Sequence, residues 1–276
     1  MHFNNIPKEE AIRAIVFSAV ESFAEGFKSR HIGELDNPNG TLNMKIHNVF
    51  IAVLGPEIQY YAALVRSFDS SLGNMLEKLA INIAGLFYDV KNHVEGTITL
   101  EQNQEIARLL ESYKRRSKKP KIEDYQILRN TIPKQTKFIR HESDYYLIDR
   151  ENNNHHLIEL KIGGDLDNKK ARSEKEAILE QFAILSNTLP KDTIVLTHFA
   201  TAYNRYGENK PWKQERVRQF FADDELLIGK DFWDFVCKSE RGYEIVLKAY
   251  KEKAYIIKEC LKDIKKLYLG DSNEIE

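Results

Sequence analysis

The first third of the chain carries apolar residues at helical spacing. Between Ile12 and Phe23 they recur every three or four positions, which predicts an amphipathic helix. Pro7 suits the first turn of that helix. The same pattern resumes in three further segments: Leu42–Leu54, Tyr60–Phe68 and Leu72–Tyr88. We therefore expect residues 1–110 to form a mainly helical part.

The pattern changes to strands after residue 140. Ser143–Arg150 and His155–Ile162 are rich in aromatic and β-branched residues, and Glu151–Asn154 between them is typical of a turn. The two segments therefore predict a β-hairpin, which Gly163 and Gly164 end.

Helices and a strand alternate after the hairpin. Apolar spacing predicts a helix at Ser173–Leu185 and a buried strand at Asp192–Ala200. Three more helices are expected at Trp212–Phe221, Lys230–Cys237 and Tyr243–Tyr268. The order predicts an α/β fold in a single domain, 1–276, whose core spans 140–240 and whose C-terminal helix spans 243–270.

The composition is that of a globular protein. Hydrophobic residues make up 42% and charged residues 30% of the 276 residues. With 41 basic and 42 acidic residues the net charge is −1, which excludes binding to nucleic acid or membrane through bulk charge alone. Two cysteines exclude a disulfide framework. We find neither a signal-peptide pattern nor an apolar run long enough to cross a membrane, and expect a soluble intracellular protein.

Residues 114–140 depart from this neutral balance. They hold ten basic and two acidic residues, a local charge of +8. The segment is either a solvated helix end with its loop or a surface that contacts phosphates, and its sequence alone favours neither.

One face of the predicted hairpin gathers charged groups. Glu159 and Lys161 share a face because side chains alternate along a strand. A hairpin centred on the turn pairs Lys161 with Asp144 and Glu159 with Tyr146, so Asp144 joins that face. Asp149, opposite His156, falls on the other face. A slip of one residue would reverse the choice between the two aspartates.

This acid–lysine face has two explanations. It is either a surface ion-pair ladder or a site where two carboxylates hold Mg²⁺. In the second case the lysine orients or deprotonates an attacking water, or neutralises charge on the transition state.

Asp144, followed on the next strand by Glu159-Leu160-Lys161, resembles the core of the PD-(D/E)xK nucleases. Ser143 stands where that motif has proline. The resemblance implies a restriction-endonuclease-like fold, a mixed central sheet flanked by helices, and catalytic roles for Asp144, Glu159 and Lys161.

Two further positions fit the resemblance. Ser67–Glu77 is similar to the Ser/Gly-rich helix of many such nucleases, whose glutamate, here Glu77, assists at the metal site. Gln181 lies on the helix after Lys161, where the superfamily often has a supporting polar residue. The stretch from His198 to Cys237 resembles type II restriction endonucleases of the TdeIII-like group.

Polar residues that suit DNA follow the strand at 192–200. Asn204, Arg205 and Gln214 are types that read base edges, whereas Lys210 and Lys213 suit phosphates. Beyond the hairpin, two more lysines, Lys169 and Lys170, suit the backbone of the cleaved strand. An ordinary polar connection is an equal alternative for the loop.

The resemblance implies a cytoplasmic prokaryotic enzyme, a type II restriction endonuclease. It implies Mg²⁺-dependent cleavage of double-stranded DNA at a short, palindromic site, by a homodimer whose system includes a protective methyltransferase. Two alternatives remain: a structure-specific repair or recombination nuclease with the same core, and a non-catalytic DNA-binding protein.

Overall fold

The structure is a computed structural model that describes residues 6–129 and 136–270. It divides the chain into two compact units. The helical unit contains Met1–Leu79 and Glu244–Glu276, and the core unit contains Ala80–Tyr243. Whether the chain folds as a single nuclease domain stays a prediction.

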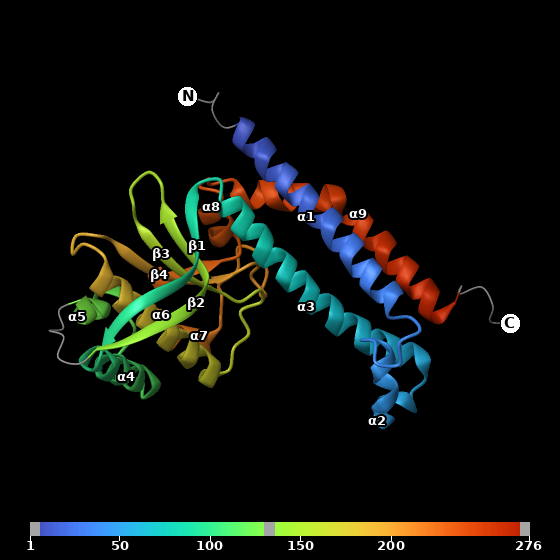
Figure 1. Ribbon diagram of the computed structural model, residues 1–276, viewed down its shortest axis with the longest axis horizontal. Coiled ribbons are helices and arrows are strands. Elements are labelled where there is room, and N and C mark those ends of the chain that lie inside the picture. Colours follow the sequence, from blue (N-terminus) through green and yellow to red (C-terminus); the bar gives the residue numbers. More distant parts are fainter. Residues whose placement is uncertain (1–5, 130–135, 271–276) are drawn as a thin grey trace. The chain divides into compact units, whose positions relative to one another are not determined.

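The helical unit is built from long helices. Its elements are α1 (Ile6–Gly33), the 3-10 helix η1 (Asn43–His47), α2 (Val49–Ala52), α3 (Pro56–Ala84, which runs on into the core unit) and α9 (Gly242–Leu269). Helices α1 and α9 lie side by side and run parallel (Figure 1). Arg13 pairs with Glu252 at 2.7 Å near one end, and Lys28 pairs with Asp263 at 2.5 Å near the other.

The core unit is built on a mixed sheet. In the described residues five strands lie in the order β1 (Tyr88–Thr99), β2 (Thr136–Asp149), β3 (His155–Leu160), β4 (Val195–Thr201) and β5 (Leu226–Ile228). The pairs β1–β2 and β2–β3 are antiparallel, whereas β3–β4 and β4–β5 are parallel.

Helices cover both faces of this sheet. The elements between and after the strands are α4 (Leu100–Lys114), η2 (Ile122–Tyr125), α5 (Gln126–Arg129), α6 (Asn168–Thr188), α7 (Glu215–Arg218), η3 (Asp223–Glu225) and α8 (Lys230–Val236). Ile178 and Phe182 of α6 share one buried cluster with Leu157 of β3, while Phe235 of α8 contacts His156 on the opposite face. The predicted mixed sheet flanked by helices is thus confirmed.

Helix α6 is the crossover between the parallel strands β3 and β4. Asp167 caps its first turn by accepting from the Lys170 N–H at 2.8 Å. Gly96 lets β1 approach this helix, because a Cβ there would lie 2.7 Å from Ile184. Helix α6 therefore packs directly against β1, and its Ile178 and Phe182 share a buried cluster with Leu157 of β3.

Two strands were not predicted. Strand β1 falls inside the part expected to be mainly helical, and its register shifts between Lys91 and His93. That bulge breaks the alternation that would have identified a strand. Strand β5 has only three residues, too few for a pattern.

Several predicted boundaries were also wrong. The helix expected at Leu42–Leu54 is the two short elements η1 and α2. The helices expected at Tyr60–Phe68 and Leu72–Tyr88 are the single helix α3, and the strand expected from Ser143 begins at Thr136. The helix expected up to Tyr88 ends at Ala84, and the strand expected up to Ile162 ends at Leu160. The helix expected over Trp212–Phe221 is only the single turn α7. Among the described residues, none of the helices combines the length and the apolar character needed to span a bilayer.

Candidate active site

Glu159 and Lys161 meet at the end of β3. The Lys161 ammonium donates to the Glu159 carboxylate, and the two side chains are 32% and 13% exposed, respectively. The Lys161 main-chain N–H donates to the Ala200 carbonyl at 3.0 Å, which extends the pairing with β4. The pair therefore lies at the carboxyl end of the central strand β3, where a substrate can reach the two side chains while hydrogen bonds to β4 hold the backbone.

A glycine turn follows Lys161 at once. Gly164 has φ +64°, and a Cβ there would lie 2.7 Å from Thr201 and 3.1 Å from Trp212. Its N–H donates to the Lys161 carbonyl at 3.0 Å. Only glycine combines this backbone conformation with this lack of space. The turn thus lets the chain leave the sheet directly behind the lysine.

Helix α6 adds a carboxylate that the sequence analysis missed. Glu174 lies 3.4 Å from the Lys161 ammonium and is 26% exposed. It lies seven residues, or two helical turns, before Gln181 and so shares a face with it. The seven-residue spacing from Gln181, which the sequence places on the helix beside the site, is the signal that points to Glu174.

The hairpin register differs from the prediction by two residues. Tyr146 pairs with Leu157, not Glu159, and Leu147 rather than Asp149 faces His156. The cause is the turn: the Asp149 N–H bonds the Asn154 carbonyl at 2.9 Å, so the loop starts one residue earlier than assumed. A shift of two residues leaves every side chain on its predicted face.

The observed register brings the Asp144 backbone level with Glu159, not with Lys161, when continued by one residue beyond the Tyr145–Ile158 pair. The Asp144 side chain lies outside the described residues, as do those of Glu142 and Ser143.

Asp149, the alternative acid, has other partners. It is 5% exposed and accepts from Lys238 at 2.7 Å and from the Glu151 N–H at 2.8 Å. Burial disfavours its charged form, but these hydrogen bonds outweigh burial and hold the pKa of Asp149 below its usual value. Asp149 thus closes the hairpin turn instead of facing the Glu159–Lys161 pair.

The residue after Glu174 on α6, Lys175, is a charged residue whose side chain is buried in the interior. Lys175 is completely buried and pairs with the equally buried Glu225 carboxylate, while Thr197 and Tyr125 donate to that carboxylate at 2.5 and 2.8 Å. Burial lowers the pKa of Lys175. This network joins α6 to β4, η2 and η3 beneath the site, and the sequence offered no sign of it.

Gln181 and Glu77 differ in burial and lie in different units of the chain. Gln181 is 4% exposed, and its Oε1 has no hydrogen-bond partner among the described residues. Glu77 is half-buried on the part of α3 that belongs to the helical unit. Its assistance at the site stays a prediction.

The residues expected to contact DNA lie in the core unit. Lys169 and Lys170 are exposed at the start of α6. Arg205 pairs with Asp165 at 2.7 Å, and this contact lowers the pKa of Asp165. Of the others, Lys213 is exposed, whereas Gln214 is only 8% exposed.

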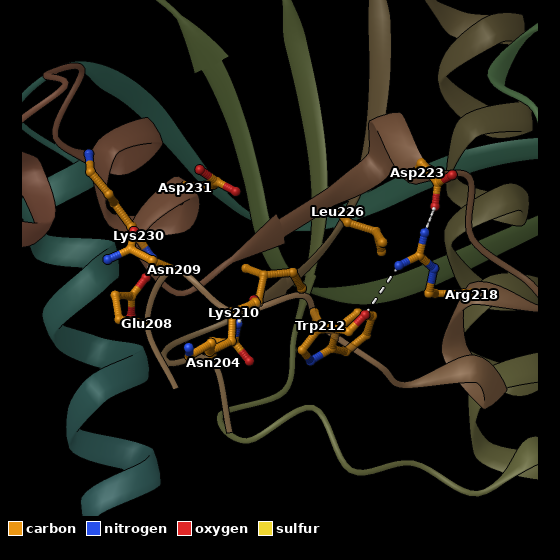
Figure 2. Close-up of a pocket in the computed structure, with 11 residues that line it drawn as sticks. Asn204, Glu208, Asn209, Lys210, Trp212, Arg218, Asp223, Leu226, Lys230 and Asp231 are labelled. Carbon is orange, nitrogen blue, oxygen red and sulfur yellow. Dashed lines mark hydrogen bonds and ion pairs between the residues drawn. The ribbon is translucent and has the colours of Figure 1, made fainter. Parts of the chain in front are cut away.

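The loop after β4 forms a pocket of about 340 Å³ (Figure 2). Asn204 shapes the loop: its side chain donates to the Lys210 carbonyl at 2.7 Å and accepts from the Tyr206 N–H at 3.0 Å. Lys210 also lines the pocket, and Asp231 faces it from α8. Burial, with Asp234 nearby, raises the pKa of Asp231. The pocket gathers Asn204 and Lys210 but not Arg205, Lys213 or Gln214.

Acidic partners take up part of the charge in the basic segment 114–140. Arg115 pairs with Glu111 at 2.8 Å and Lys118 with Asp124 at 2.7 Å; Lys119 lies 3.4 Å from Asp223. Lys134 lies outside the described residues. These contacts favour a solvated surface for the first part of the segment.

The described side chains contain no cluster of three or more His, Cys, Asp or Glu that could hold a metal ion. Glu159 and Glu174 both offer carboxylate oxygens beside Lys161, the donor type that Mg²⁺ prefers. The chemistry of these donors therefore fits a magnesium ion, with Asp144 as the further ligand expected from sequence.

Comparison with known proteins identifies the family. The family model of the type II restriction endonuclease HinfI matches residues 8–254. No curated protein and no solved structure matches the chain. The match leaves the TdeIII-like resemblance untested, and it favours a restriction enzyme over a repair nuclease or a non-catalytic DNA-binding protein. The chain belongs to the HinfI family of type II restriction endonucleases, which are site-specific deoxyribonucleases.

Proposed function

We propose that this endonuclease hydrolyses duplex DNA with Mg²⁺ at a short palindromic site, and that Glu159 and Lys161 carry the chemistry. The contact between the Lys161 ammonium and the Glu159 carboxylate at the end of β3 is the observation that supports this most. A carboxylate and a cation that lie together at the accessible end of a strand are the groups that in-line attack on a phosphate needs.

Each residue has a distinct role in this proposal. Glu159 and Asp144 would hold the metal, which when bound would act as a Lewis acid on the scissile phosphate. Lys161 orients or deprotonates the attacking water, or neutralises charge that develops on the phosphate. Glu174 of α6 contacts the same ammonium and holds the Lys161 side chain together with Glu159. Glu77 assists, and Gln181 supports the site from within α6.

Cleavage of a sequenced plasmid tests the proposal. Wild type should give discrete fragments with Mg²⁺ and none with EDTA, and sequencing of their ends reveals the target. Glu159→Ala and Lys161→Ala should abolish the fragments, while Lys251→Ala, a change at an exposed lysine of α9, should leave them intact. Fragments from Lys161→Ala at the wild-type rate would contradict the assigned roles.

For DNA contacts, exposure supports some candidates more than others. Arg205 and Lys210 are exposed on the loop after β4, where Asn204 and Arg205 would read bases and Lys210 and Lys213 would contact phosphates. Lys169 and Lys170 would contact the cleaved strand. Gln214 is buried, so it would need to move before it could read a base.

A homodimer would match the two strands of a palindromic site. Support comes from the helical unit, which exposes several large apolar side chains close together in sequence, called here the apolar patch: Met44, Val49, Phe50, Val53, Leu54, Ile58 and Val65. Phe50 is 83% and Val53 81% exposed. Monomeric proteins rarely expose such a group of side chains, whereas subunit interfaces bury them. A methyltransferase of the same specificity would protect host DNA.

A further inference from the structure

A second pocket, remote in sequence from Glu159 and Lys161, lies within the helical unit. It has a volume of about 520 Å³ and is formed by α1, the segment before α2, and α3. The lining residues are Arg30, Thr41, Met44, Asn48, Ala63, Arg66, Ser67, Ser70 and Ser71. They include two arginines, three serines and a threonine, and none of them carries a carboxylate.

The α3 wall of this pocket follows from helical spacing. Ala63, Arg66, Ser67, Ser70 and Ser71 are spaced at three- and four-residue intervals and so lie on one face of the helix. Small hydroxyl side chains keep this face open and leave room for a ligand beside the arginine. The same serines begin the segment that the sequence analysis singled out for Glu77 alone.

Arg30 is held in position at this wall. Its Nη2 donates to Ser67 Oγ at 3.1 Å and to Ser71 Oγ at 3.0 Å, and its guanidinium lies 5.2 Å from the centre of the Phe27 ring. Behind it, the fully buried His31 contacts Ser67 Oγ through Nε2 at 3.1 Å. Both arginine bonds use one nitrogen, and Nη1 and Nε are further donors of the same group.

The donors of this pocket match an anion with several oxygens. Guanidinium groups bind phosphate through paired hydrogen bonds, and hydroxyl and amide groups add neutral donors. Asn48 accepts from the Ile51 N–H through its side-chain oxygen at 3.4 Å, and its amide nitrogen is a further donor. The carboxylate of Glu34 lies just beside the lining, where it accepts from the Thr41 N–H at 2.7 Å. The two arginines outnumber this single negative charge, so the pocket favours an anion over a cation or an apolar group.

We propose that this pocket binds a phosphate group through Arg30 and Arg66. The phosphate is either one of the DNA backbone, which would make the helical unit a second DNA-contacting surface, or a free phosphate. The proposal is independent of which residues cleave DNA, because binding at this pocket needs none of the groups around Lys161.

The test measures binding without cleavage. Affinity of the full chain for a fluorescent duplex that contains the mapped target is measured by anisotropy in EDTA at several NaCl concentrations. Loss of one phosphate contact should reduce the slope of log K against log[NaCl] by about 1 and weaken binding by about three- to tenfold at moderate salt. We expect this result for Arg30→Gln and for Arg66→Gln.

Controls separate the sources of phosphate. Arg13→Gln removes an arginine of the same unit that already pairs with Glu252, and it should leave the slope unchanged. Circular dichroism checks folding, and Arg66→Gln, a change at an exposed side chain, serves if Arg30→Gln unfolds the unit. Thermal unfolding with added inorganic phosphate provides the second arm.

Each outcome decides the proposal. An altered DNA slope supports a backbone phosphate. An unaltered slope, with stabilisation by inorganic phosphate in wild type but not in Arg66→Gln, supports a free phosphate. If neither the slope nor the phosphate response of the two variants differs from Arg13→Gln, the pocket does not bind phosphate.

Discussion

Lys161 is the residue at which the chemistry of the core unit converges. Two glutamates from different elements approach it, Glu159 from β3, which ends just before Lys161, and Glu174 from α6. A lysine side chain has four flexible bonds, and each carboxylate that holds it reduces the positions it can occupy. Glu174 therefore restricts the Lys161 side chain in addition to Glu159.

Glu174→Gln tests this role. Loss of the charge should leave Lys161 less well positioned and lower the single-turnover cleavage rate by about ten- to a hundredfold, the usual range for residues that orient active-site groups. Glu176→Gln changes a nearby carboxylate of the same helix and is the control. Equal rates for the two variants would show that Glu174 has no part in positioning the lysine.

Among individual residues, prediction succeeded where side-chain alternation was enough. Glu159 and Lys161 are two residues apart in sequence, so the two-residue period of a strand alone brings their side chains to one side. Glu174 is thirteen residues further along, and its contact depends on where α6 begins and how it crosses the sheet. A single sequence does not contain that geometry in any local pattern.

At the scale of elements, the paired strands β3 and β4 bury two histidines against α8. His156 Nδ1 and His198 Nε2 are 3.1 Å apart, and Phe235 packs against both rings. Burial lowers the pKa of His156 to about 4 and that of His198 to about 3. Both rings are therefore neutral in the folded protein at neutral pH.

Acid should destabilise the fold through this pair. A histidine whose folded pKa lies below its unfolded value of about 6.5 contributes its full stability above pH 6.5 and loses it as the pH falls towards 4. We expect the free energy of unfolding, measured with urea, to drop by on the order of 2 kcal/mol for each histidine between pH 7 and pH 5, and so by about 3–4 kcal/mol for the pair. The drop in unfolding free energy should be smaller in His156→Phe than in the control His93→Gln, a change at a partly exposed histidine of β1. An identical drop in both variants would show that the two buried histidines do not cause the acid sensitivity.

The glycine turn after Lys161 predicts that two glycine-to-alanine substitutions change the stability of the fold in opposite directions. Gly164→Ala forces a side chain into a left-handed conformation, at a cost of about 1–2 kcal/mol, and adds a clash with Thr201. Gly26→Ala, in the middle of α1 with open space around it, should instead stabilise by up to about 1 kcal/mol. Chemical denaturation of both variants measures the contrast, and similar unfolding free energies would contradict it.

Local signals account for the elements that were predicted and for those that were missed. The hairpin and the crossover helix α6 follow from alternation, turn residues and helical spacing within short segments. The register prediction was wrong because the Asp149 N–H bonds the Asn154 carbonyl across the turn. The composition of the turn does not reveal at which residue the loop starts. Strand β1 pairs with a partner about fifty residues away, and its bulge hides its period.

At the scale of the whole molecule, the apolar patch predicts that the protein forms a dimer. Replacing Phe50 and Val53 together by serine removes the two most exposed apolar side chains, so a dimer that buries them should dissociate. Analytical ultracentrifugation at micromolar concentration should show a dimer for wild type and a monomer for the double variant. Tyr255→Ser, at an exposed tyrosine of α9, is the control. A wild-type monomer, or a double variant that stays dimeric, would remove the patch from the interface.

Lys175 and Glu174 are neighbours on α6 with opposite surroundings, one fully enclosed by the core and the other beside Lys161. A helix cannot turn one of them without turning the other. Variants that are selected only for folding would therefore keep the rotational setting of α6, because an unpaired Glu225 in the interior is costly. Selection for a stable fold would thereby also preserve the placement of Glu174 beside Lys161. Under the roles proposed above, screens for foldability should then enrich for active enzymes without direct selection for cleavage.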